Sequence, residues 1–226
     1  SITPAGKPDA PMGVNAVAGN GSATVSFTAP TVTGGPAIAS YTVTASPNGA
    51  TCTVNAPATS CVVPGLTNGT AYTFAVTANN GLFTSSASTA SSSVVPATVP
   101  GAPTSVTATS TASGTATISF TAPANGGSAI TGYTVTPSPA TEGASCTGSG
   151  ISYTCTGLTD GVAYTFAVVA VNAIGNSTAG TNSSALTTQG AASAPTTISA
   201  TRGDSQATVT FSGATANGST ITSYTV

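Results

Sequence analysis

The sequence contains no histidine and no tryptophan, and charged residues make up only 3% of it, against about 25% in an ordinary globular protein. Without histidine the chain lacks the commonest general base and the commonest metal ligand. Nucleic-acid binding requires clustered basic residues against phosphate, yet the only two, Lys7 and Arg202, lie far apart. The composition therefore argues against nucleic-acid binding and offers little to a catalytic or metal site.

Long apolar runs are missing too. No stretch approaches the roughly 18 apolar residues of a membrane helix, and Ser1 to Pro4 have neither the charged nor the apolar region of a signal peptide. We expect no direct membrane insertion, and a chain that is either processed or a window from a longer one. The hydrophobic fraction of 39% nevertheless separates it from disordered sequences.

What the sequence does contain is an internal repeat, which is the first feature to seek in any chain. The prolines of three Ala-Pro pairs, Pro11, Pro103 and Pro195, are each 92 residues apart. Shorter motifs recur at nearly the same spacing, such as Ala71–Val76 and Ala163–Val168. A period of this length is the size of a complete small β-sandwich rather than of a solenoid unit.

The repeat predicts a division of the chain into modules and linkers. The predicted ranges are 1–9 for the end of a preceding repeat with its linker, 10–96 for module 1, 97–101 for a linker, 102–188 for module 2, 189–193 for a linker, and 194–226 for an incomplete third module. The third holds about three strands, too few to close a sandwich alone. We expect a longer array, or alternatively a neighbouring molecule that completes the fragment.

Alternation of apolar and polar residues predicts β-strands. Between the alternating runs lie turn signals such as Asn20-Gly21 and Asn48-Gly49. No segment has helical periodicity, so we predict an all-β class with about seven short strands per module. The residues predicted to point inward in module 1 are Ala23, Val25, Phe27, Tyr41, Val43, Ala45, Tyr72, Phe74, Val76 and Ala78.

The four cysteines are as regular as the repeat. Cys52 and Cys61 enclose eight residues, and so do Cys146 and Cys155. A pair repeated in each module predicts one intradomain disulfide per module and an oxidising compartment, outside the cell or at its surface. The alternative, a metal site, needs clustered ligands that the sequence does not place near the cysteines.

Two stretches carry a family resemblance. Gly127–Val135 resembles the third-strand region of bacterial fibronectin type III modules, and Gly157–Phe166 resembles their turn and sixth strand, with Leu66–Phe74 as its counterpart in module 1. The resemblance implies tandem immunoglobulin-like Greek-key β-sandwiches of three plus four strands. It also implies tyrosine corners at Tyr72 and Tyr164. The family usually has tryptophan in its second strand, where this chain has Phe27, Phe120 and Phe211.

Residues capable of catalysis are few. Glu142 and Asp160 are the only plausible carboxylate pair for glycoside hydrolysis, but Asn68 replaces Asp160 in module 1 and Asp160-Gly161 is typical of a turn. No glycine-rich phosphate loop precedes a helix. We therefore predict that the chain is not an enzyme and has no cofactor and no metal.

Two further motifs leave alternatives open. Arg202-Gly203-Asp204 spells the integrin-binding tripeptide of some fibronectin modules, but it falls between the first two strands rather than the last two, and a simple turn also explains it. Five Asn-x-Ser/Thr sequons suggest surface glycans, although a chain rich in Ser, Thr and Asn-Gly turns generates them by chance. The sequons begin at Asn20, Asn68, Asn176, Asn182 and Asn217.

Three functional hypotheses fit these features. The first is a structural array, a stalk, surface layer or extracellular fibre, that self-associates or contacts neighbouring modules of the same chain. The second is an adhesin or carbohydrate-binding array, for which only Phe83 and Tyr153 are expected to be exposed aromatic residues. The third is a spacer within a secreted polysaccharide-degrading enzyme.

Overall fold

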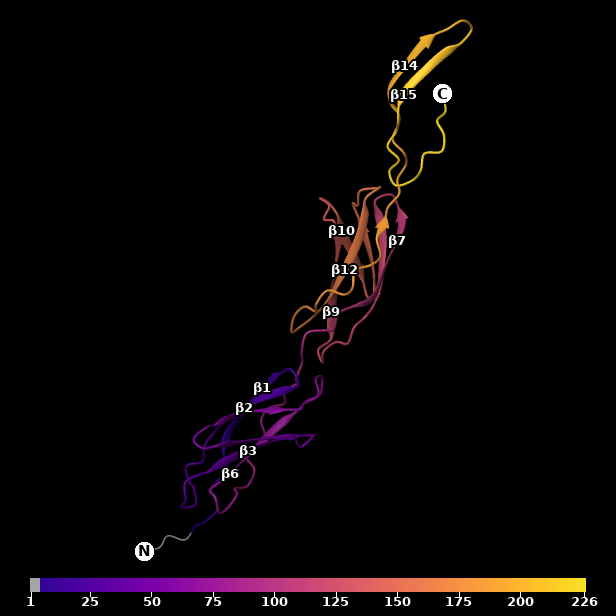
Figure 1. The fold of residues 1–226 in the computed structure, drawn as a ribbon. Coiled ribbons are helices and arrows are strands. Elements are labelled where there is room, and N and C mark those ends of the chain that lie inside the picture. Colours follow the sequence, from indigo (N-terminus) through magenta and orange to yellow (C-terminus); the bar gives the residue numbers. More distant parts are fainter. Residues whose placement is uncertain (1–4) are drawn as a thin grey trace. The chain divides into compact units, whose positions relative to one another are not determined.

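The computed structural model describes residues 5–226, which form strands, turns and irregular segments and no helix (Figure 1). The expectation that residues 1–4 end a preceding repeat lies outside the described residues. The chain divides into two compact units, one holding the residues up to Pro100 with 125–129 and 172–175, the other holding the rest. The class is all-β, as predicted.

Module 1 contains six strands in two three-stranded sheets. One sheet has the order β1-β2-β5 and the other the order β4-β3-β6, all neighbours being antiparallel. Alternate residues of each strand face the space between the sheets, because successive side chains of a strand point to opposite faces. The strands are β1 (Met12–Gly19), β2 (Ser22–Thr28), β3 (Ser40–Ser46), β4 (Thr51–Asn55), β5 (Ser60–Pro64) and β6 (Thr73–Asn79).

The core of module 1 lies between these sheets. Phe74 and Val76 of β6 are fully buried, as are Val25 of β2 and Val43 of β3. All ten residues predicted to point inward are buried in one cluster. Burying each large apolar side chain contributes about 1.5–3 kcal/mol, so this layer supplies most of the hydrophobic stabilisation of the module.

The predicted seventh strand of module 1 is absent as a regular strand. The segment after β6 makes only isolated bridges, at Thr84 and Val94, because every third residue of it, rather than every second, pairs with β6. At those positions Ser85, Ser88 and Ser91 each donate their N–H to a β6 carbonyl. Each serine hydroxyl in turn accepts a hydrogen bond from the N–H of the same β6 residue, a bond that the serine's backbone carbonyl would accept in a regular strand. We call these three residues the serine ladder.

Module 2 has seven strands in a different arrangement. The sheets have the orders β10-β11-β8-β7 and β13-β12-β9, so β10 pairs with β11 whereas its equivalent β4 pairs with β3. The three-plus-four division is therefore present in module 2 only. The strands are β7 (Thr104–Ala112), β8 (Thr115–Thr121), β9 (Ile130–Ser138), β10 (Ser145–Ser149), β11 (Ser152–Thr156), β12 (Ala163–Asn172) and β13 (Leu186–Thr187).

The last part of the chain is a two-stranded hairpin of β14 (Thr196–Arg202) and β15 (Ala207–Ser212). The incomplete third module was expected to hold about three strands, but only these two form, and residues 223–226 have no paired neighbour with which to make a strand. Tyr224 nevertheless stacks on Phe211 with ring centroids 4.9 Å apart. The same pair occurs in module 1 as Phe27 and Tyr41, also at 4.9 Å.

Candidate functional site

Two disulfides are present, as predicted, and the described residues include no free cysteine. Cys52–Cys61 joins β4 of one sheet to β5 of the other, and so closes one side of the module 1 sandwich. Cys146–Cys155 joins neighbouring strands of one sheet, where the two residues stand directly opposite each other. The same sequence spacing thus cross-links two sheets in module 1 and a single sheet in module 2.

The tyrosines that the resemblance assigns to corners lie in the cores of their modules. Tyr72 is 2% exposed and Tyr164 is 1% exposed. The N–H of Thr67 donates to the Tyr72 hydroxyl at 3.1 Å, and the N–H of Thr159 donates to the Tyr164 hydroxyl at 3.0 Å. Each phenol therefore fixes the turn five residues before it and satisfies its own buried hydroxyl.

The carboxylate of Asp160 stabilises a turn rather than serving as a reactive group. Its two carboxylate oxygens accept hydrogen bonds from the hydroxyl of Ser113 and from the N–H of Gly114, the latter at 2.8 Å. These bonds, the one from Ser113 first, lower the pKa of Asp160 from its ordinary value of 3.8. Gly114 has φ of 61°, a left-handed conformation suited to glycine. The carboxylate therefore anchors the β7–β8 turn.

Asn68 occupies the equivalent position in module 1. Its Oδ1 accepts the N–H of Gly21 at 2.8 Å, and its Nδ2 donates to Asn20 Oδ1 at 2.8 Å. Asn and Asp thus perform the same turn-holding task in the two modules. The other predicted carboxylate, Glu142, is exposed in the loop between β9 and β10.

The structure brings together few groups with reactive chemistry. Among residues 5–226 no three His, Cys, Asp or Glu side chains gather closely enough to hold a metal ion. Over the same range, no helix has the length and apolar character needed to cross a bilayer.

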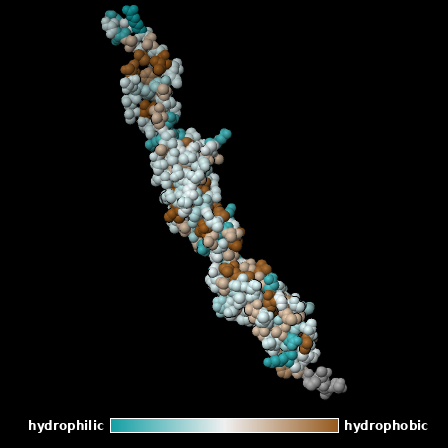
Figure 2. Space-filling view, turned by 180° about the vertical axis from the view of Figure 1, so that it is seen from behind, coloured by the Kyte–Doolittle hydropathy of each residue, from teal (hydrophilic) through white to brown (hydrophobic). Residues whose placement is uncertain are grey.

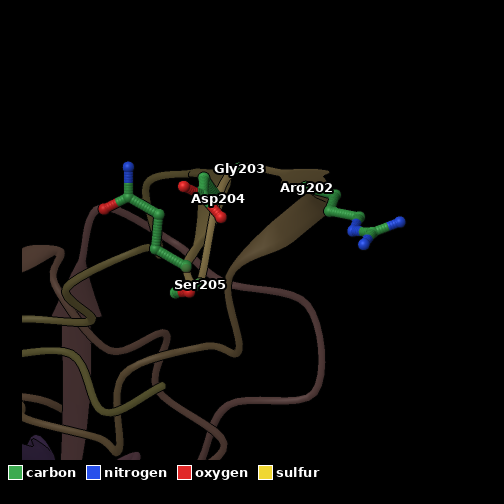
Figure 3. Close-up of a pocket in the computed structure, with 5 residues that line it drawn as sticks. Arg202, Gly203, Asp204 and Ser205 are labelled. Carbon is green, nitrogen blue, oxygen red and sulfur yellow. The ribbon is translucent and has the colours of Figure 1, made fainter.

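The Arg202-Gly203-Asp204 motif forms the tip of the β14–β15 hairpin. The N–H of Gly203 donates to Gln206 O at 2.8 Å, and Ser205 has φ of 51°, which together make a tight turn. All of these residues are exposed around an open, polar hollow. Arg202 extends to one side of the turn, away from Asp204 and Ser205 (Figure 3).

The sequon asparagines are all at least partly accessible. Asn20, Asn176 and Asn182 are exposed, whereas Asn68 and Asn217 are half-buried. Asn217 also donates its Nδ2 to Ala191 O at 2.7 Å.

In two of these sequons the middle residue is a serine whose hydroxyl is already hydrogen-bonded. The hydroxyl of Ser177 accepts the N–H of Ala170, and that of Ser183 accepts the N–H of Phe166. Both serines are buried.

One of the two aromatic residues expected at the surface is not there. Phe83 is 41% exposed, but Tyr153 is only 9% exposed and packs on Phe120, with ring centroids 6.1 Å apart. The expectation for Tyr153 was wrong because alternation along β11 turns it inward, beside Cys155. A sugar-stacking surface thus loses one of its two candidate residues.

Sequence reasoning missed a pair of buried asparagines. Asn80 and Asn172 are each 4% exposed. Asn80 donates its Nδ2 to Gly6 O at 3.0 Å and to Thr33 O at 2.8 Å, while its Oδ1 accepts the N–H groups of Leu82 and Phe83. The side chain therefore ties the peptide that precedes module 1 to the end of β6.

Asn172 repeats this arrangement at the end of β12. It donates to Thr98 O at 2.8 Å and to Asn125 O at 2.9 Å, and it accepts the N–H groups of Ile174 and Gly175. The signal that could have revealed both residues is their identical place in the 92-residue repeat. We call Asn80 and Asn172 the linker clamps.

An uncovered apolar face lies on the β14–β15 hairpin. Ile198 is 68% exposed and Tyr224 is 44% exposed, and both line a hollow of about 180 Å³. In Figure 2 hydrophobic residues gather near the end of the chain that this hairpin forms, while much of the visible surface has intermediate hydropathy. Phe211 also lines this hollow, and the module 1 side chains equivalent to Phe211 and Tyr224, which are Phe27 and Tyr41, are buried.

The comparisons with known proteins agree with this architecture. The family profile described as "Fibronectin type III domain" matches residues 9–94 and 101–186. The chain therefore belongs to the fibronectin type III family, and its complete modules are two tandem domains of that family. Domains of this kind are generally non-catalytic, and their tandem arrangement with disulfides fits an extracellular or cell-surface protein.

The FN1–FN3 domains of chicken CNTN1 are 18% identical to this chain, with 90% of this chain and 75% of that one covered and a TM-score of 0.44. No curated protein sequence is similar enough to this chain to count as a match.

Proposed function

We propose that this chain is a non-catalytic structural array of a secreted or cell-surface protein, serving in a stalk, a surface layer or an extracellular fibre. The observation that carries the proposal is that the polar side chains buried in each module bind the backbone of that module or of the peptide leading into it. The tyrosine corners, the linker clamps and the serine ladder all form hydrogen bonds of this kind. Such groups stabilise a unit rather than recognise a ligand.

The disulfides and the composition support the same role. A disulfide closing so short a loop stabilises a module by about 2.6 kcal/mol in the chain-entropy model, which suits a module exposed outside the cell. The net charge of −2 leaves little repulsion between copies, which favours self-association. The likeness of Gly127–Val135 to bacterial modules supports a bacterial source.

Electron microscopy of the native material, prepared under non-reducing conditions, tests the proposal. Ordered filaments or layers are expected. Discrete particles with a large globular end would contradict it and would indicate instead that the modules are spacers of a secreted enzyme, such as one acting on polysaccharides.

A second candidate role, adhesion, is favoured by one observation, the exposure of Arg202, Gly203 and Asp204 at a hairpin tip. Cell attachment to the immobilised chain would then fall strongly on Asp204→Ala and remain with Asp9→Ala, a matched change outside the motif. Unchanged attachment with Asp204→Ala would end this candidate.

Glycans on the sequons are a further proposal, supported by the accessibility of Asn20, Asn176 and Asn182. Intact mass spectrometry of the native material decides it. The measured mass is expected to exceed the mass of the bare sequence with two disulfides by the mass of whole sugar units. A mass equal to that of the bare sequence would contradict the proposal.

A further inference from the structure

The strand that carries the first cysteine of each module pairs differently in the two modules. In module 1, β4 lies beside β3, with Val43 opposite Cys52. In module 2, β10 lies beside β11, with Cys146 opposite Cys155. The sheet β13-β12-β9 therefore ends at β9, and no strand among the described residues pairs with the open side of β9.

Module 1 shows which backbone groups of β9 face that open side. The N–H of Ala45 in β3 donates to Ala50 O at 2.8 Å, across the connection to β4. Alternate residues of an antiparallel strand direct their N–H and C=O groups to the same side. Tyr41 and Val43 therefore face β4 in module 1, in agreement with their register.

The residues of β9 equivalent to Tyr41 and Val43 are Tyr133 and Val135, 92 positions later. Tyr41 is 3% exposed under β4, whereas Tyr133 is half-buried. A hollow of about 250 Å³ lies beside Tyr133, between β9 and the turn from β10 to β11. The N–H and C=O groups of Tyr133 and Val135 thus point to an edge that no described strand covers, and the hollow opens beside Tyr133.

This edge has few of the features that keep an edge strand from pairing with another chain. Natural edge strands are kept short, bulged or charged to avoid meeting another chain, but β9 is nine residues long and contains no charged residue. Among the other outer strands of the two complete modules, β13 has two residues, β4, β5 and β10 have five each, β1 and β7 have irregular registers, and the serine ladder occupies the open side of β6. Within β9 the one residue without a backbone N–H is Pro137, near the end of the strand.

We propose that β9 is the surface through which two copies of this chain associate, by antiparallel pairing of β9 with β9 of the second copy. In the register centred on Thr134, Tyr133 of one copy lies opposite Val135 of the other, and their N–H and C=O groups exchange hydrogen bonds. Such aromatic and β-branched cross-strand pairs are favourable. Two three-stranded sheets then become one continuous sheet, with Pro137 at its margin.

The choice of a second copy as the occupant follows from the edge itself. Threonine and apolar residues alternate in β9 as they do in β4, the strand that covers the same edge in module 1. A net charge of −2 per chain opposes such pairing only weakly. The inference rests on the proposed structural role, to which it adds a defined contact between chains.

Charge substitutions at Thr134 test the pairing, because this exposed residue meets its own copy in the proposed register. Sedimentation analysis of the wild-type chain is expected to show a concentration-dependent dimer. Thr134→Lys and Thr134→Glu should each weaken it by about tenfold or more, since like charges directly opposite each other repel. An equimolar mixture of the two variants should restore it.

Thr42 provides the matched control, since it is the equivalent residue in module 1, where β4 covers the edge. Thr42→Lys should leave the dimer unchanged. Association that survives both Thr134 variants would overturn the β9 contact while leaving the structural role intact. A wild-type chain that stays monomeric at every concentration would also overturn the β9 contact, and the microscopy of native material would then decide the structural role separately.

Amide hydrogen exchange gives an independent measurement. In dilute solution the amides of Tyr133 and Val135 should exchange rapidly, in contrast to those of Tyr41 and Val43, and they should become protected as the concentration rises. Equal protection of the two pairs in the dilute monomer would show that β10 covers β9 and would overturn the proposal.

Discussion

At the scale of single residues, the modules are held by polar side chains that bind backbone groups far away in sequence. Asp160, Asn68 and the linker clamps each span more than forty residues of chain in this way. Buried polar groups contribute stability only when they are paired, and losing one partner costs more than the bond itself contributes. Single substitutions at the buried linker clamps should therefore have large and specific effects.

Asp160 makes the acid stability of module 2 differ from that of module 1. Because its pKa is lowered in the folded state, its stabilising effect is full above the ordinary carboxyl pKa and is lost as the pH falls through the folded value. Module 2 should lose protection against amide exchange on acidification from neutral pH to about pH 2. Asp160→Asn should abolish this dependence by recreating the turn of module 1. An unchanged acid response in Asp160→Asn would contradict the assignment.

The linker clamps predict a second effect. Asn80→Ala should lower the free energy of unfolding of module 1 by roughly 2–4 kcal/mol, because it leaves two carbonyls and two N–H groups without their partner. Urea unfolding measures the change. Asn15→Ala, at an exposed position of β1, is the control and should stay within about 0.5 kcal/mol of wild type. Equal values for the two variants would exclude a clamp.

At the scale of elements, the segment after β6 shows how far sequence patterns reach. Strict alternation identified the inward faces of β2, β3 and β6, because each of those strands has a regular partner on at least one side. The sequence also predicted about seven strands per module, but the segment after β6 in module 1 forms the serine ladder and no regular seventh strand. In this segment every third residue pairs with β6, and the spacing is visible in the sequence as Ser85, Ser88 and Ser91. The spacing indicates pairing only once it is known that the serine hydroxyls accept hydrogen bonds in place of backbone carbonyls.

The serine ladder predicts that substitutions at two adjacent serines differ in their effect on the stability of module 1. Ser91→Ala should destabilise module 1 by about 1–3 kcal/mol, because the buried N–H of Phe74 would lose its acceptor. Ser92→Ala, at the exposed neighbouring position, should have an effect below about 0.5 kcal/mol. Urea unfolding of the two variants and the wild type compares them. A Ser91 variant as stable as the Ser92 variant would mean that the hydroxyl is dispensable.

Module 2 departs from the ladder at one position for a steric reason. Gly180 stands where module 1 has Ser88, and its N–H still donates to Val168 O at 2.9 Å. A Cβ atom there would collide with the carbonyl oxygen of Pro103. Such an exclusion depends on tertiary packing, so sequence periodicity could not supply it.

At the scale of the whole molecule, the repeat and the cysteine spacing predicted the fold class and the disulfides. They could not predict that β4 and β10 join different sheets, since the disulfide spacing is the same in both modules and does not show which strand the first cysteine's strand pairs with. The choice between the sheets depends on many small packing terms. The linker clamps were missed for a related reason, as an asparagine after a strand is also typical of a turn.

Single-molecule force extension of the chain, with and without reductant, tests most directly the claim that its modules are independent, disulfide-closed structural units. Two separate unfolding events are expected, one for each complete module. With the disulfides intact, the nine-residue spans between the cysteines cannot extend, so reductant should lengthen each event by about 25 Å. A single merged event, or lengths unaffected by reductant, would contradict this account of the protein.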